Sequence, residues 1–171
     1  MRRSLTREAL LTLLHALVVT KVDYCSSTLA GVSSALLQCL QSVLNAAARL
    51  VFSARTSEHI TPLLRELHWL KVPERIQFRL CVLKHRCLHG TAPPYLDETL
   101  QLTADVQGRH LRSASTSTLV IPPTCRATIG DRAAASRAWN SLPTSVREIQ
   151  SLPAFRRKLK TALFAISFPA D

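Results

Sequence analysis

Two stretches in the first third of the chain carry apolar residues at helical spacing. We predict a first helix over residues 5–20 and a second over 33–52, with Ser33 or Ser34 as the N-cap of the second. The apolar positions recur every three or four residues and are Leu10, Leu13, Leu14 and Leu17, followed by Lys21, in the first helix, and Leu37, Leu40, Val43, Leu44, Ala47 and Leu50 in the second. Stripes of this kind predict that the two helices pack against each other.

Proline and glycine mark two further helices in the middle of the chain. A short helix is expected over residues 60–67, with Thr61 as its cap and Pro62 at the first helical position. A longer helix begins after Pro73, which suits a first turn, and ends at Gly90, which favours the left-handed conformation that stops a helix.

The last part of the chain combines a helix with a different kind of signal. Residues 151–164 form the fourth long helix, with an apolar inward face that consists of Leu152, Phe155, Leu159 and Phe164. Residues 119–130 indicate two short β segments around a Pro-Pro turn. We therefore predict a mainly α protein: a bundle of four or more helices with a small β hairpin in the C-terminal half, divided into a helical region 1–90 and a basic region 91–171.

The charge of the chain narrows the class of partner. Its 22 Lys and Arg face 11 Asp and Glu, which leaves a formal charge of +11 and attracts polyanions. RNA or DNA is the first partner to consider and an anionic membrane surface the second. The chain holds no run of about 18 uninterrupted apolar residues, so we expect no membrane-spanning helix.

The cysteines and the first residues of the chain indicate the cellular compartment of the protein. Five cysteines, an odd number without framework spacing, favour reduced thiols and a reducing, intracellular compartment. The first stretch has a basic start and an apolar centre, but Glu8 and His15 interrupt it and no small-residue cleavage site follows. We therefore expect that the protein is not secreted.

The residue patterns of common enzymes are missing from the sequence. The four glycines form no phosphate-binding loop, no serine lies between glycines in a nucleophile elbow, and the aspartates are scattered singly. Cys81, His85 and His89 share a helical face with Cys87 nearby, but ligands at i, i+4 and i+8 spread over about 12 Å, too far for one metal ion. Buried cysteines, with histidines at a helix end favouring its dipole, are the better interpretation. We expect no enzyme activity, no metal, no cofactor and no small-molecule substrate.

Basic residues concentrate in the C-terminal third. The last predicted helix carries Arg156, Arg157, Lys158 and Lys160 on its flanks and outer face, and six arginines precede it: Arg109, Arg112, Arg126, Arg132, Arg137 and Arg147. Arginine binds phosphate through its planar fork. A charge run on a helix is more often only a solvated face, so phosphate contact and simple solvation both remain open.

An ordered series of short motifs carries a family resemblance. The motifs are ALVVTKVDYC, LQSVLNAAARLV, HITPLLRELHWLKVPERIQF, KHRCLHGTAPPYL, RHLRSAS, TIGDRA, WNSLP and FRRKLKTALF. In this order and spacing, which covers nearly the whole chain, the sequence resembles the C-terminal part of non-LTR (LINE-type, jockey-like) retrotransposon reverse transcriptases. The resemblance implies a place in the helical thumb and the region after it, downstream of the polymerase palm and its metal-binding aspartates.

What the resemblance implies for function is nucleic-acid contact without catalysis, in the nucleus through the family's life cycle. Contact is expected from the second helix and the basic C-terminal region. The residues assigned to it are Arg49, Arg126, Arg132, Arg137, Arg156, Arg157, Lys158 and Lys160. The chain departs from the family pattern at residues 28–31, where a Trp-Gly-like pair is usual, and at residues 133–138, where the family has a Phe and a Pro.

Two other hypotheses stand beside nucleic-acid binding. In the first hypothesis, the chain is a helical interaction module that docks on the missing palm or another protein. An exposed apolar face on the first two helices would favour this hypothesis. In the second hypothesis, the chain is a relic open reading frame with no selected function. Whether its messenger RNA is translated distinguishes this hypothesis from the other two.

Overall fold

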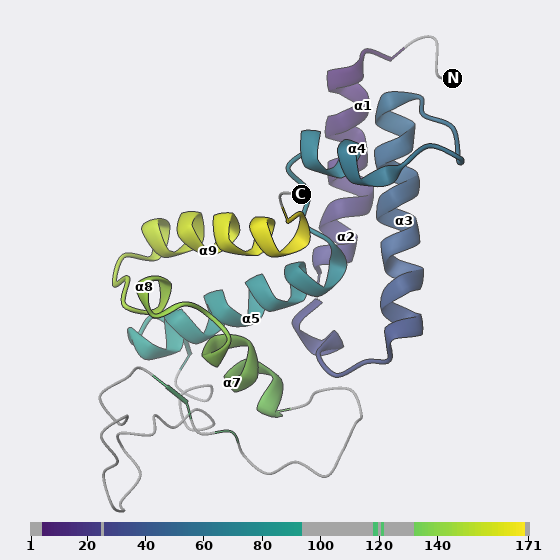
Figure 1. The fold of residues 1–171 in the computed structure, drawn as a ribbon. Helices are drawn as coiled ribbons and strands as arrows, with labels where there is room; N and C mark the ends of the chain where they lie inside the picture. The colour runs from purple at the N-terminus through teal and green to yellow at the C-terminus, as the bar shows by residue number, and fades with distance from the viewer. Residues whose placement is uncertain (1–4, 25, 94–117, 120, 122–131, 170–171) are drawn as a thin grey trace, which may run out of the picture.

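The computed structural model describes residues 5–24, 26–93, 118, 119, 121 and 132–169. These residues are mainly helical, as predicted, and Figure 1 shows how the helices are arranged. The helix that contains α1 and α2 lies side by side with α3, and α4 crosses this pair. The long helices α5 and α9 pack against each other, and α7 lies on α5.

The first helical stretch starts and ends two to three residues later than predicted and changes its winding. It consists of α1 (Arg7–Leu14), a π-helical turn η1 (His15–Val19) and α2 (Thr20–Asp23). The Thr6 hydroxyl accepts a hydrogen bond from the Ala9 N–H at 3.2 Å and so caps its start. The short 3-10 turn η2 (Ser26–Leu29) follows.

The predicted inward face of this first helix is only half right. Leu14 is buried and Leu10 is partly buried, but Leu13 and Leu17 are 44% and 61% exposed. Leu17 lies within the π turn, whose extra residue rotates side chains away from the 3.6-residue repeat on which the prediction rested. Leu13 precedes the turn, so the turn does not account for its exposure. Val19 is buried instead, with Val18 and Val22 packed beside it.

Helix α3 (Ser34–Phe52) packs against the first helix as predicted. Ser33 is its N-cap by position, although its side chain makes no capping hydrogen bond. The buried residues of α3 are Leu44, Ala47, Ala48 and Val51, while Val43 is 47% exposed. By length and composition, α3 is also the one helix in the described part of the chain that is apolar enough to cross a membrane, with 22% of its apolar window buried.

The start of α4 differs from the prediction. Helix α4 (Ile60–Glu66) has His59 at its N-cap, so Thr61 is not the cap and Pro62 is the third helical residue. Proline is accommodated there because the first N–H groups of a helix have no intrahelical partner.

Helix α5 (Val72–Leu88) confirms both of its predicted ends. Pro73 lies in its first turn, and the chain leaves the helix through Gly90, whose φ is 62°. The Gly90 and Thr91 N–H groups bond the Cys87 and Arg86 carbonyls at 3.1 and 2.8 Å, which closes the helix end.

Two short helices in the C-terminal half were not predicted. They are α7 (Arg132–Asn140) and α8 (Thr144–Arg147). The last helix, α9 (Leu152–Ser167), was predicted and starts after Ser151. Its predicted inward face is right at Phe155 and Leu159, which are fully buried. Leu152 and Phe164 are only partly buried, and Leu163, which was not predicted, is fully buried.

The predicted β hairpin has no counterpart in the described residues, which contain no strand. Most of segment 119–130 lies outside them. Leu119 is buried, and its N–H and carbonyl both bond the side-chain amide of Asn140, at 3.0 and 2.9 Å. A side chain on α7 therefore satisfies both backbone groups of Leu119.

Two hydrophobic clusters stabilise the fold and share α5. The first joins the α1–α2 helix, α3 and α4 to Val72 and Ile76 of α5. The second joins Cys81 of α5 to Trp139 of α7 and Phe155 of α9. The division into regions 1–90 and 91–171 stays a prediction, but α5, from the first region, forms the base on which α7 and α9 of the second region pack.

Candidate nucleic-acid interface

A cleft of about 830 Å³ lies between the first helix, the α4–α5 connection, α5 and α9. Its floor is apolar and largely covered, because Val19, Trp69 and Leu70 are buried and Leu67 and Phe78 are half-buried. Its rim is charged. The basic rim residues are Arg7, Arg75, Arg79, Arg156 and Lys160, and the acidic ones are Glu8, Asp23 and Glu66. The lining therefore has an excess of two positive charges, which attracts an anion.

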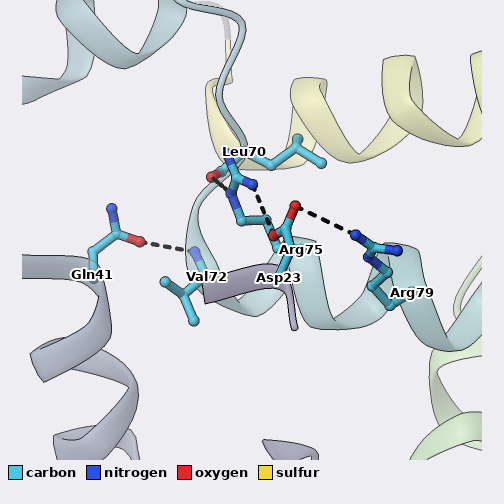
Figure 2. Close-up of polar contacts among 6 residues, drawn as sticks. All are labelled: Asp23, Gln41, Leu70, Val72, Arg75 and Arg79. Carbon is cyan, nitrogen blue, oxygen red and sulfur yellow. Dashed lines mark hydrogen bonds and ion pairs between the residues drawn. The ribbon is translucent and has the colours of Figure 1, made fainter. Parts of the chain in front are cut away.

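Asp23 connects the first helix to α5 across the cleft (Figure 2). One carboxylate oxygen, Oδ1, accepts a hydrogen bond from Nη1 of Arg75 at 2.9 Å, and Oδ2 lies 3.6 Å from Nη2 of Arg79. Arg75 and Arg79 are four residues apart, so they lie on the same face of α5. The Arg75 pair is the more sheltered of the two, with the Arg75 side chain 11% exposed and that of Arg79 52%.

Hydrogen bonds to the backbone hold the start of α5 in this position. Nε of Arg75 donates to the Leu70 carbonyl at 2.9 Å, and Oε1 of Gln41 on α3 accepts the Val72 N–H at 2.8 Å (Figure 2). Since Val72 is buried, its N–H has little access to water and needs this partner. The side chain of α3 thus caps α5, which orients Arg75 and Arg79 toward Asp23.

On the opposite side of the cleft, Arg7 of α1 pairs with Glu66 of α4. Their closest atoms are 2.6 Å apart, and the Arg7 guanidinium also lies 4.3 Å from the centre of the Phe52 ring. Both side chains of the ion pair are more than half exposed, so the pair contributes little to stability.

Among the described residues, the α9 side of the cleft carries positive charge without a counter-charge. Arg156 and Lys160 are four residues apart on one helical face, directly beside the buried positions Phe155 and Leu159. Both side chains are exposed, and within the described part of the chain neither makes an ion pair or a side-chain hydrogen bond. As far as the described residues go, these two cations are available to a ligand, whereas Arg7, Arg75 and Arg79 are already engaged.

The structure separates the residues that the sequence grouped together. Arg156 and Lys160 line the cleft, but Arg157 and Lys158 are exposed on other faces of α9. Arg49 lies outside the cleft, where its guanidinium donates to the Glu58 carbonyl at 3.3 Å. Arg137 is exposed on α7 and does not line the cleft. The Arg132 side chain is not described, and Arg126 lies outside the described residues.

The sequence analysis did not single out Arg7, Asp23, Arg75 or Arg79. The spacing of Arg75 and Arg79 held a usable signal, because two like charges at i and i+4 on one helix repel unless an acidic group lies between them. Nothing in the sequence indicates that this group is Asp23, 52 residues before Arg75.

The cluster of cysteines and histidines on α5 belongs to the second hydrophobic cluster, through Cys81 and through the contact of His85 with Phe155. Within the described residues, no three His, Cys, Asp or Glu side chains are grouped in a way that could hold a metal ion. Cys81 is fully buried, and burial raises the pKa of its thiol to about 12. His85 is 1% exposed and stacks on Phe155 with ring centres 4.3 Å apart.

His85 does not stabilise the helix end through charge, contrary to the expectation. Its Nε2–H donates to the Ile149 carbonyl at 2.8 Å, while the buried Nδ1 has no hydrogen-bond partner among the described residues. A proton on Nδ1 would therefore be buried without an acceptor. Burial lowers the pKa of His85, and the nearby His89 lowers it further, although the Ile149 bond acts in the opposite direction.

This environment predicts that the protein loses stability in mild acid. Below pH about 6.5 the unfolded chain binds a proton at His85 that the folded chain does not. The free energy of unfolding should therefore fall as the pH drops from about 6.5 toward the lowered pKa. A His85→Gln variant keeps a donor for Ile149 but does not titrate, so in urea unfolding at a series of pH values its stability should depend less on pH in this window. An equally steep dependence in the variant would contradict the assignment.

Comparison with models of protein families, with curated proteins and with solved structures finds no match to this chain. The case for function therefore depends on the geometry of the cleft and on the resemblance of the sequence motifs.

Proposed function

We propose that this chain is a non-catalytic nucleic-acid-binding segment related to the C-terminal part of a retrotransposon reverse transcriptase. It binds the phosphates of RNA or DNA on the α9 side of the cleft. One observation carries the proposal: Arg156 and Lys160, which have no counter-charge in the described part of the chain, face the same cleft as Arg75 and Arg79.

The physical basis is the release of counterions from a polyanion. Each phosphate that a cation neutralises frees a condensed counterion, so affinity decreases as salt concentration increases. Arg156 offers the forked donors that match phosphate oxygens, and Lys160 adds a point charge one helical turn away. Arg79 is bound to Asp23 only at 3.6 Å and more than half exposed, so it is the next cation available to a bound phosphate.

A double variant on α9 and a matched control test the proposal. Arg156→Ala with Lys160→Ala removes two charges from the cleft, and Arg157→Ala with Lys158→Ala removes the same two charges from the same helix elsewhere. Binding of a short RNA–DNA hybrid and of its separate RNA strand is measured from about 50 to 200 mM salt. The cleft variant should bind more weakly, with the slope of log K against log salt reduced by about 2. The control variant should reduce both the affinity and this slope less than the cleft variant does.

Equal losses in the two variants would mean that only net charge attracts the nucleic acid, and the proposal would be wrong about the site. No binding by the wild-type chain would contradict the proposal as a whole. Circular dichroism of each variant verifies that α9 is folded in all of them.

Exposed apolar residues favour a second candidate, a module that docks on a protein partner such as a polymerase palm. Leu13 and Leu17 on the first helix and Leu36 and Val43 on α3 are 44–61% exposed. Large exposed apolar patches are typical of protein interfaces. Without its partner, such an apolar face should make the isolated chain self-associate, which analytical ultracentrifugation measures. The double variant Leu17→Lys with Leu36→Lys should then reduce this self-association without lowering the melting temperature. Unchanged association would count against this candidate.

A further inference from the structure

The cleft combines two kinds of surface that one ligand must match. Its rim presents Arg156 and Lys160, which have no acidic partner among the described residues. Its floor is largely covered, but the apolar side chains of Leu11, Leu67 and Phe78 stay partly exposed. A ligand with only charge would leave the floor in contact with water, and one with only apolar surface would leave the cations unpaired. The complementary ligand carries anionic groups and apolar faces side by side.

A single-stranded nucleic acid has this arrangement, and a duplex does not. Its unpaired bases expose flat faces, each of which stabilises binding by about 1–3 kcal/mol when it stacks on an aromatic side chain such as Phe78, while its phosphates follow the backbone. A duplex buries these faces in its own stack and presents phosphates and groove edges. The cleft volume of about 830 Å³ falls within the range of small-ligand sites, which suits a nucleotide rather than a double helix.

We propose that the cleft receives unpaired nucleotides of a single strand. The phosphates bind Arg156 and Lys160, and a base lies against the floor at Leu11, Leu67 and Phe78. The inference depends on the proposed function, because it specifies which form of nucleic acid occupies the same cleft.

The test compares three ligands of equal length: a single-stranded oligonucleotide, an abasic strand with the same phosphodiester backbone, and the duplex of the same sequence. Fluorescence anisotropy at one salt concentration gives the three affinities. The single strand should bind about 5-fold or more tightly than the abasic strand, which corresponds to at least one stacked base. It should also bind more tightly than the duplex.

A floor variant separates stacking from charge. Phe78→Leu keeps an apolar residue of similar size but removes the ring, so it should reduce the preference for the strand with bases and leave the affinity for the abasic strand unchanged. Arg156→Ala with Lys160→Ala should weaken binding of both strands.

The outcomes distinguish this inference from the proposed function. Equal binding of the base-bearing and abasic strands, both weakened by the Arg156 and Lys160 substitutions, overturns the single-strand inference but leaves phosphate binding in place. Tighter binding of the duplex than of the single strand also overturns the single-strand inference and leaves phosphate binding in place. If polyglutamate of matched charge binds as tightly as the single strand, the cleft is a site for an acidic protein segment, and both the inference and the proposed function are wrong.

Discussion

Replacing Trp139 with alanine is expected to lower the free energy of unfolding by about 3–5 kcal/mol. Trp139 is fully buried at the meeting point of α5, α7 and α9, with its ring centre 5.7 Å from that of Phe155. Alanine removes the whole ring and leaves a cavity among residues such as Leu142 and Val146, and close-packed neighbours refill such a cavity only in part.

Urea or guanidinium unfolding measures this loss, and Tyr24→Ala is the control. Tyr24 is an aromatic residue that is 77% exposed, so its removal should change stability by no more than about 0.5 kcal/mol. A loss at Trp139 as small as that at Tyr24 would show that α7 does not pack into the second core in solution.

Asp23→Asn is expected to change stability and nucleic-acid affinity in opposite directions. The amide cannot balance the charge of Arg75, whose side chain is 11% exposed, so the free energy of unfolding should fall by about 1–3 kcal/mol. The same change removes one of the three carboxylates of the cleft and releases Arg75 and Arg79 from their counter-charge. Binding of RNA should therefore become tighter and its salt dependence steeper, by about one unit of slope.

Glu148→Gln is the control, because it removes one negative charge at the C-cap of α8, outside the cleft. If Asp23→Asn weakens binding although the variant is folded at the temperature of the assay, Asp23 orients Arg75 and Arg79 for phosphate instead of competing with it. Equal tightening in the two variants would indicate that only the overall charge matters.

The long helices were predictable because sequence and local physics agree in them. Helix α5 starts around Pro73 and leaves through Gly90, and α9 repeats an apolar residue at Phe155 and Leu159. The short helices α7 and α8 lacked such signals. Helices shorter than about 12 residues are marginal in isolation, so α7 exists because Ala133 and Trp139 are buried in the folded chain.

The candidate site was predictable only in part. The exposure of Arg156, Arg157, Lys158 and Lys160 followed from the inward face of α9 and is confirmed. Which pair faces the cleft depends on where the first helix and α5 lie around α9, and periodicity holds no information about neighbours. The π turn at His15–Val19 likewise escaped prediction, because a helical repeat of 3.6 residues is assumed when an inward face is read from sequence.

By itself, the sequence determined the positive charge of the chain, its helical class and the stop at Gly90, since these depend on composition, on the spacing of apolar residues and on the conformational freedom of glycine. Only the tertiary structure decided that Asp23 meets Arg75 and that Arg156 and Lys160 share a cleft with them. The physical reason is that contacts between residues tens of positions apart arise from the packing of whole helices, which buries apolar faces and leaves each charge to the partner that the packing brings to it.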